Sequence, residues 1–93
     1  MRLTSEEIFN IKSVIREFDP RARIYLFGSR VDDNKRGGDI DLLIFSDSLT
    51  ERDKRRIRIG LYDKLGVQKI DILIARDLSK PFVRLAYSEG IEL

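Results

Sequence analysis

The sequence contains no cysteine and no histidine among its 93 residues. These absences exclude disulfides, thiol nucleophiles, structural zinc sites and acid–base catalysis by imidazole. The chain also has no apolar run close to the roughly 20 residues that cross a bilayer, so we expect no membrane-spanning segment. The first residues turn acidic where a signal peptide would be apolar, which predicts a cytoplasmic protein. Any chemistry must depend on carboxylates, hydroxyls, lysine, arginine and metals that prefer oxygen ligands.

The chain is also short and nearly neutral. It is long enough for one hydrophobic core, so we expect a single domain over residues 1–93, with no accessory domain for a second substrate. Its 18 basic and 16 acidic residues give a formal net charge of +2, which supports nucleic-acid binding only weakly. Five basic residues form a charge run in the first half of one predicted helix: Arg52, Lys54, Arg55, Arg56 and Arg58. A charge run on a helix usually marks a solvated face, and no nucleic-acid-binding motif is present, so we expect no nucleic-acid partner.

Helices and strands are predicted to alternate along the chain, which indicates an α/β (α+β) fold. Helical spacing of apolar residues and capping signals predict helices over residues 5–18, 51–65 and 80–89, the last one capped by Ser79. Runs rich in β-branched and aromatic residues predict strands over 22–27, 39–45 and 67–74, with an edge strand at 91–93. The strand over 39–45 is apolar on both faces apart from two carboxylates, which predicts a central place in the sheet. The polar segment 28–38 is expected to form a loop.

Three aspartates lie in predicted strands, where this residue type is rare. Asp39 and Asp41 are two residues apart and therefore point to the same side of their strand, and Asp71 lies between two isoleucines of the next strand. If the isoleucines face the helices, the three carboxylates share the opposite face. Like charges so close together need a cation, and oxygen ligands without His or Cys select Mg²⁺ or Mn²⁺. The alternative is that Asp39 merely begins a strand and Asp71 pairs with an arginine.

A second motif, Gly28-Ser29-Arg30, follows the first predicted strand. Glycine allows the backbone to come close to a phosphate, and Ser29 can donate hydrogen bonds to phosphate oxygens from its hydroxyl and its N–H. Taken alone, the motif is more often a plain turn, and it is neither a P-loop nor a dinucleotide fingerprint. Arg30 is either a further phosphate contact or a surface residue.

Together these residues resemble the signature of the polymerase-β nucleotidyltransferase superfamily: Gly28-Ser29, a spacer of nine residues, Asp39-Ile40-Asp41, and then Asp71 in the following apolar strand. The segments LFGSR and GDIDLLI and the short chain are similar to the minimal nucleotidyltransferases, or MNT proteins, which are antitoxins of HEPN toxins in prokaryotic two-gene modules. The resemblance implies a polymerase-β-like fold with a mixed β-sheet and helices mainly on one of its faces.

The resemblance also implies a role for each motif residue. Gly28, Ser29 and Arg30 would bind the nucleotide, and the three aspartates would hold Mg²⁺, with two ions expected and Mn²⁺ as a substitute. Asp71 would be a metal ligand, a general base, or both. Gly38 stands where many relatives have serine, which removes one possible contact to the nucleotide.

The function implied by the resemblance is transfer of AMP from ATP to a hydroxyl, in the first place a tyrosine, of a HEPN toxin, as the antitoxin of a type VII-like module. Leu43, Phe45 and Leu73 are expected on the carboxylate face as exposed apolar surface, which a partner or a second copy of the chain would cover. We therefore expect a protein acceptor and a homodimer or hetero-oligomer. Two alternatives stay open: a non-catalytic antitoxin with the same fold, and nucleotidyl transfer to a small molecule or a nucleic acid.

Overall fold

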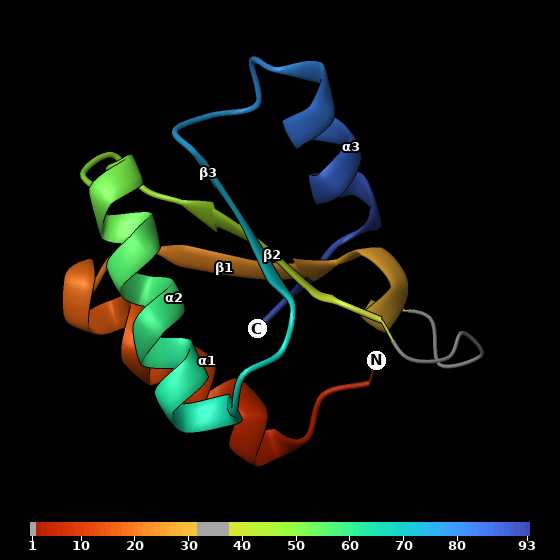
Figure 1. The fold of residues 1–93 in the computed structure, drawn as a ribbon. Helices are drawn as coiled ribbons and strands as arrows, with labels where there is room; N and C mark the ends of the chain where they lie inside the picture. Colours follow the sequence, from red (N-terminus) through yellow and green to blue (C-terminus); the bar gives the residue numbers. More distant parts are fainter. Residues whose placement is uncertain (1, 32–37) are drawn as a thin grey trace.

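The computed structural model describes residues 2–31 and 38–93. The elements follow in the order α1 (Ser5–Phe18), β1 (Arg23–Phe27), the 3-10 turn η1 (Gly28–Val31), β2 (Ile40–Phe45), α2 (Glu51–Leu65), β3 (Ile70–Ala75), α3 (Pro81–Glu89) and β4 (Ile91–Glu92) (Figure 1). Within the described residues, no helix is both long enough and apolar enough to cross a membrane. The predicted α/β class is confirmed.

The four strands form one mixed sheet in the order β3-β2-β1-β4. β1 runs antiparallel to both β2 and β4, whereas β2 and β3 are parallel. The central place predicted for β2 is confirmed. The two strands are parallel because α2, which lies between them in the sequence, returns the chain to the end of the sheet where β2 begins.

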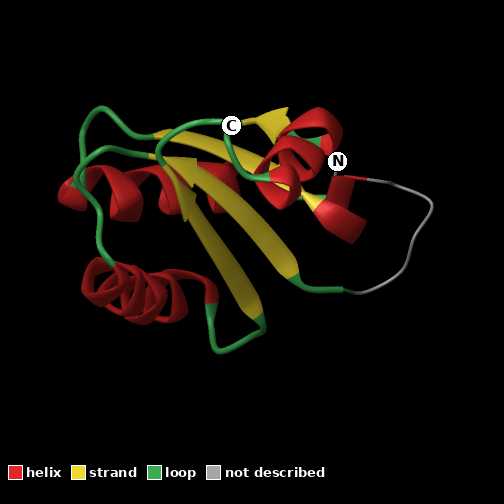
Figure 2. Ribbon diagram, turned by 90° about the horizontal axis from the view of Figure 1, so that it is seen from above, coloured by secondary structure: helices red, strands yellow, loops and turns green. Residues whose placement is uncertain are grey.

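Helices cover both faces of the sheet unequally, with α1 and α2 on one face and α3 on the other (Figures 1 and 2). The main core lies between the sheet and the α1–α2 layer, where Ile11 and Leu61 pack with Ile40, Leu42 and other alternate residues of β2 and β3. Because side chains alternate along a strand, this packing turns the remaining residues of β2 and β3 to the α3 face. The prediction of helices mainly on one face is confirmed.

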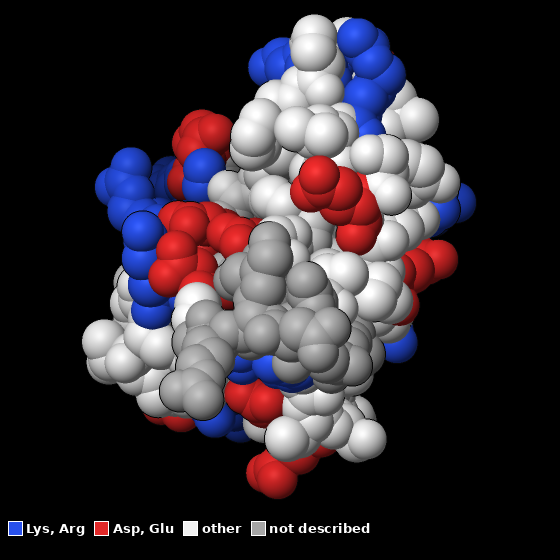
Figure 3. Space-filling model, turned by 90° about the vertical axis from the view of Figure 1, so that its right-hand side faces the viewer, with Lys and Arg blue, Asp and Glu red and all other residues white. Residues whose placement is uncertain are grey.

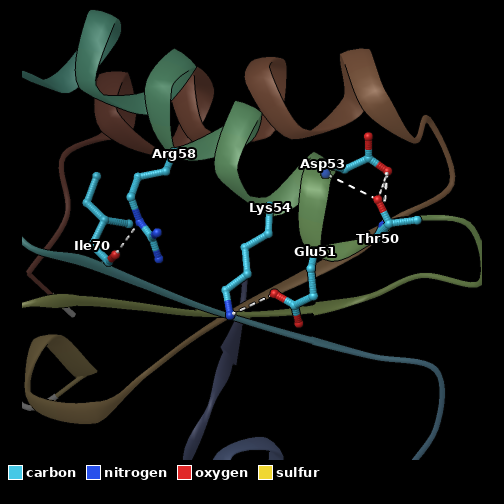
Figure 4. Close-up of polar contacts among 6 residues, drawn as sticks. All are labelled: Thr50, Glu51, Asp53, Lys54, Arg58 and Ile70. Atoms are coloured by element: carbon cyan, nitrogen blue, oxygen red, sulfur yellow. Dashed lines mark hydrogen bonds and ion pairs between the residues drawn. The ribbon is translucent and has the colours of Figure 1, made fainter.

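Capping boxes begin the two long helices. The backbone N–H of Glu7 donates to the Thr4 hydroxyl at 3.1 Å, and the Glu7 carboxylate accepts from the Thr4 N–H at 2.8 Å. In α2 the same exchange joins Thr50 and Asp53 at 3.2 and 2.9 Å (Figure 4). The part played by Asp53 is hard to see in the sequence, because capping boxes usually have glutamate or glutamine at this position.

Two predicted element starts are wrong. Ser79 does not cap α3: the capping position is Lys80, without a side-chain hydrogen bond, and the Ser79 N–H instead donates to the Asp77 carboxylate at 2.9 Å. β3 begins at Ile70 rather than at residue 67. Val67 directly follows Gly66, the glycine that ends α2, and its side chain is 87% exposed instead of packing in the sheet. Residues 67–69 carry the chain from the helix layer to the sheet.

The predicted exposed apolar surface on the carboxylate face is also corrected. Leu43 is fully buried and packs with Tyr25, Val83 and Ala86, while Phe45 and Leu73 are partly buried at the edge of the same cluster. The chain covers this surface itself, because α3 follows β3 and folds back over it. α3 itself carries exposed apolar side chains, the most exposed of which are Phe82 and Leu85.

Candidate nucleotide and metal site

Three carboxylates converge at the beginning of β2 and β3. The parallel register places Asp41 directly beside Asp71, and Asp39 lies immediately before β2. One oxygen from each of the three side chains lies within 4.8 Å of the others, with Asp71 exposed and the other two half-buried. The three side chains therefore lie close together, as predicted, while their roles stay predictions.

Gly28 lies directly under this cluster. A Cβ atom added to Gly28 would come within 2.2 Å of Oδ2 of Asp41, and Gly28 has a φ of +77°, which disfavours any residue with a side chain. The sequence suggests this glycine for its approach to a phosphate. The structure adds a second reason, since only a residue without Cβ leaves room for the Asp41 carboxylate. Ser29 is the next residue of η1, so the Gly-Ser motif and the Asp-x-Asp motif meet in space.

Lys69 is a member of the cluster that the sequence analysis missed. Its Nζ lies 3.3 Å from Oδ2 of Asp39, and this hydrogen bond is the main cause of a raised pKa for the lysine. The contact depends on strand register, because the pairing of Ile40 with Ile70 places the preceding residues side by side. The sequence alone could not have supplied that register.

The cluster carries excess negative charge despite Lys69. Burial, in the first place, and the neighbouring carboxylates of Asp71 and Asp39 together raise the pKa of Asp41 to about 6. A cation binds favourably between such carboxylates, because its charge offsets their mutual repulsion. Mg²⁺ prefers oxygen ligands of this kind. Figure 3 shows several acidic patches on one face of the molecule, one of which has basic side chains beside it. The residues present therefore fit a divalent metal ion.

The raised pKa of Asp41 predicts a pH-dependent stability for the metal-free protein. Between pH 4 and about 6 the folded protein keeps a proton on Asp41 that the unfolded chain has released, since the pKa rises from 3.8 to about 6. The free energy of unfolding should therefore fall as pH rises through this range, relative to an Asp41→Asn variant. We expect a relative loss of about 1 kcal/mol, allowing for solvent screening. Urea denaturation of both proteins, with chelator and at several pH values, measures this difference in the free energy of unfolding. Parallel pH profiles of the two proteins would contradict the prediction.

Arg30 points to a different set of partners from those suggested by the sequence. Its guanidinium donates to the backbone carbonyl of Arg2 at 2.9 Å and to that of Gly38 at 3.4 Å, and the Arg2 N–H donates back to the Arg30 carbonyl. These bonds hold the N-terminal segment and the chain before Asp39 against η1. Contact with a nucleotide stays a prediction for Arg30.

Three of the five basic residues between Arg52 and Arg58 in α2 have partners within the chain. Arg58 donates to the carbonyl of Ile70 at 3.2 Å, and Lys54 forms an ion pair with Glu51 at 3.6 Å (Figure 4). The guanidinium of Arg56 lies over the Phe18 ring, 5.7 Å from its centroid. These contacts support a structural role for much of the basic face.

A cavity lies at the opposite end of the strands from the aspartates. It has a volume of about 740 Å³ and is lined by residues that follow β2 and β3 and precede β1, among them Ser46, Arg76, Asp77 and Arg21. Beside it, the buried Asp19 accepts hydrogen bonds from the Ser46 hydroxyl at 2.5 Å and the Arg21 N–H at 2.9 Å. The hydrogen bond from Ser46 is the main cause of the lowered pKa of Asp19. This network fixes the ends of α1 and β2, away from the aspartate cluster.

Comparison with known proteins decides the family. The sequence matches the family described as nucleotidyltransferase domain over residues 8–91. The chain belongs to this nucleotidyltransferase family. No curated protein matches the sequence. Among solved structures, the nucleotidyltransferase domain is similar to a chain in the crystal structure of a mutant of the toxin-antitoxin MntA-HpeT, with a TM-score of 0.75, 23% sequence identity, and coverage of 99% of this chain and 72% of that chain.

The two motifs that stand out in the sequence lie within the residues that the family model covers. The Gly-Ser turn and the strand carboxylates meet across β1 and β2. The structural likeness also confirms the fold, because the mixed sheet with helices α1, α2 and α3 is shared with that chain.

Proposed function

We propose that the protein transfers AMP from ATP to a tyrosine hydroxyl of a HEPN-domain toxin and thereby acts as its antitoxin. The observation that carries the proposal is the convergence of Asp39, Asp41 and Asp71 over Gly28, in a domain of the nucleotidyltransferase family. The toxin partner is supported by the likeness to a chain of a toxin-antitoxin structure. We further propose that residues 1–93 act as one domain, and that the reaction takes place in the cytoplasm.

The proposed reaction is an in-line displacement at the α-phosphorus of ATP. The acceptor oxygen forms a new bond to the α-phosphorus, the bond from that phosphorus to the oxygen bridging to the β-phosphate breaks, and pyrophosphate leaves. Asp39, Asp41 and Asp71 would hold Mg²⁺, which supplies neutralisation of the triphosphate charge and of the leaving group when bound. Gly28 and Ser29 would place their backbone against the phosphates.

We assign Asp71 to the acceptor hydroxyl rather than to the nucleotide. It is the exposed member of the three carboxylates, whereas Asp41 is half-buried against Gly28. A hydroxyl that belongs to another protein must approach from solvent, so Asp71 is the carboxylate that it reaches first. We propose that Asp71 orients this hydroxyl and accepts its proton.

The proposal predicts that Asp71→Asn abolishes transfer to the toxin without abolishing the complex. Loss of a single carboxylate from the reacting centre should lower the rate by about 100-fold or more, whereas the contact with a partner depends on a wider surface. The measurement is intact-mass spectrometry of the toxin after incubation with ATP, Mg²⁺ and each protein, together with gel filtration of the complex.

The same experiment tests the non-catalytic alternative. If the wild-type protein neutralises the toxin with no added AMP mass, and Asp71→Asn neutralises it equally well, the protein is a binding antitoxin and the proposed transfer is wrong. Asp63→Asn is the matched control, because Asp63 is an exposed carboxylate on α2 outside the cluster. This variant should transfer AMP at the wild-type rate.

A further inference from the structure

Phe82, in the first turn of α3, is an exposed aromatic residue beside the acidic cluster. Its side chain is 59% exposed, and its ring makes an edge-to-face contact with Phe27, with 6.4 Å between the ring centroids. Leu85, one turn further along α3, is 54% exposed. The two residues extend the apolar cluster under α3 out to the surface.

Phe27 connects this surface to the carboxylates. It pairs with Asp41 in the β1–β2 register, and residues directly opposite each other in such a pair have Cβ atoms about 4.5–5.5 Å apart on the same face. Phe27 also directly precedes Gly28, over which the Asp41 carboxylate lies. Phe27 therefore contacts Phe82 through its ring and is the strand partner of Asp41, a carboxylate that we assign to the metal.

We propose that Phe82 is the platform on which the nucleobase of the bound nucleotide stacks. The inference rests on the proposed function, since it needs a triphosphate held at Gly28 and Asp41. With the phosphates there, the planar base must lie on neighbouring surface. On the β3 side this surface is charged, with Lys69 next to Asp39, whereas on the α3 side it is formed by the Phe27 and Phe82 rings.

Stacking of this kind recognises a class of ligand rather than one base. Every nucleobase has a π-face, and stacking on an aromatic side chain contributes about 1–3 kcal/mol per base with little preference among bases. The proposal therefore assigns to Phe82 a part in binding nucleotides as a class. It predicts similar dependence on Phe82 for ATP and for GTP.

The test compares Phe82→Ala with wild-type protein in titration calorimetry with Mg²⁺ and either ATP or inorganic tripolyphosphate. We expect the affinity for ATP to fall roughly tenfold and the affinity for tripolyphosphate to stay unchanged, because only ATP carries a base. Phe9→Ala is the matched control: Phe9 is 69% exposed and lies on α1, on the other face of the sheet. Its affinity for ATP should equal that of the wild type.

A second variant makes the contact visible without relying on a loss of binding. The chain contains no tryptophan, so Phe82→Trp introduces a single fluorescent probe at the proposed platform. ATP with Mg²⁺ should quench its fluorescence and tripolyphosphate should not. In a Phe9→Trp variant, neither ligand should change the emission.

The outcomes separate this inference from the function on which it rests. If Phe82→Ala binds ATP as tightly as the wild type and the Phe82→Trp emission is unchanged by ATP, the platform is wrong while nucleotide binding stands. Weaker binding of the toxin by Phe82→Ala, with normal ATP affinity, would assign Phe82 to the protein partner and overturn the inference. If wild-type protein binds neither ATP nor tripolyphosphate, the proposed function fails and the platform fails with it.

Discussion

Replacement of Asp39 and Asp41 by asparagine should lower the rate of nucleotidyl transfer by about a thousandfold or more in a protein that stays folded. The two carboxylates belong to the cluster whose oxygens meet within 4.8 Å, and loss of a divalent ion from such a centre removes several kcal/mol of transition-state stabilisation. The fold should survive, because asparagine has nearly the same shape and removes the charge whose burial, together with repulsion from Asp71, raises the pKa of Asp41.

Thermal unfolding measures the binding side of this prediction without any acceptor. For the wild type, ATP with Mg²⁺ should raise the melting temperature more than either ligand alone, because a ligand that binds only the folded state stabilises it. The double variant should show no such joint effect and should melt no lower than the wild type when metal is absent. Equal shifts in both proteins would remove the metal site from these residues.

Gly28→Ala should disable the site as thoroughly as loss of a carboxylate. The added Cβ would lie 2.2 Å from Oδ2 of Asp41, so the carboxylate must turn away from its present position. The φ of +77° adds backbone strain, for which we expect destabilisation of about 1–3 kcal/mol. Transfer should fall by at least about 100-fold, and the stabilisation by ATP with Mg²⁺ should disappear.

Gly66 provides a matched control for the backbone part of this effect. Gly66 also has a positive φ, +84°, but a Cβ added there would meet nothing within 4 Å. Gly66→Ala should therefore lower the free energy of unfolding by a similar amount and leave metal-dependent nucleotide binding intact. If both variants lost nucleotide binding in equal measure, general destabilisation would explain the result and the steric role of Gly28 would be wrong.

The elements of this fold could largely be predicted from local sequence signals. The Thr4–Glu7 capping box and the apolar spacing that follows determine α1, and the β-branched and aromatic runs locate β1 and β2 to within one residue. Element boundaries that depend on the path of the chain were not predicted correctly. The start of α3 was misplaced because Ser79 is an acceptable cap by residue type, whereas the path of the chain from β3 places the first helical residue at Pro81.

The candidate site divides in the same way. Asp39, Asp41 and Asp71 stand out in the sequence because carboxylates are unusual in apolar strands, and the period of two residues predicts their common face. Their distance from Gly28 and the pairing of Lys69 with Asp39 were not predictable, because both depend on the register between strands.

The sequence by itself determined that any metal site of this protein uses oxygen ligands, because the chain has no histidine and no cysteine, and it marked Asp39, Asp41 and Asp71 as the candidate carboxylates. Only the tertiary structure decided which surface surrounds that site. The apolar residues of the carboxylate face look exposed when β2 and β3 are considered alone, yet α3 buries Leu43 and exposes Phe82 in its place. The physical reason is that burial depends on where a later helix packs, and strand periodicity specifies a face without specifying what covers it.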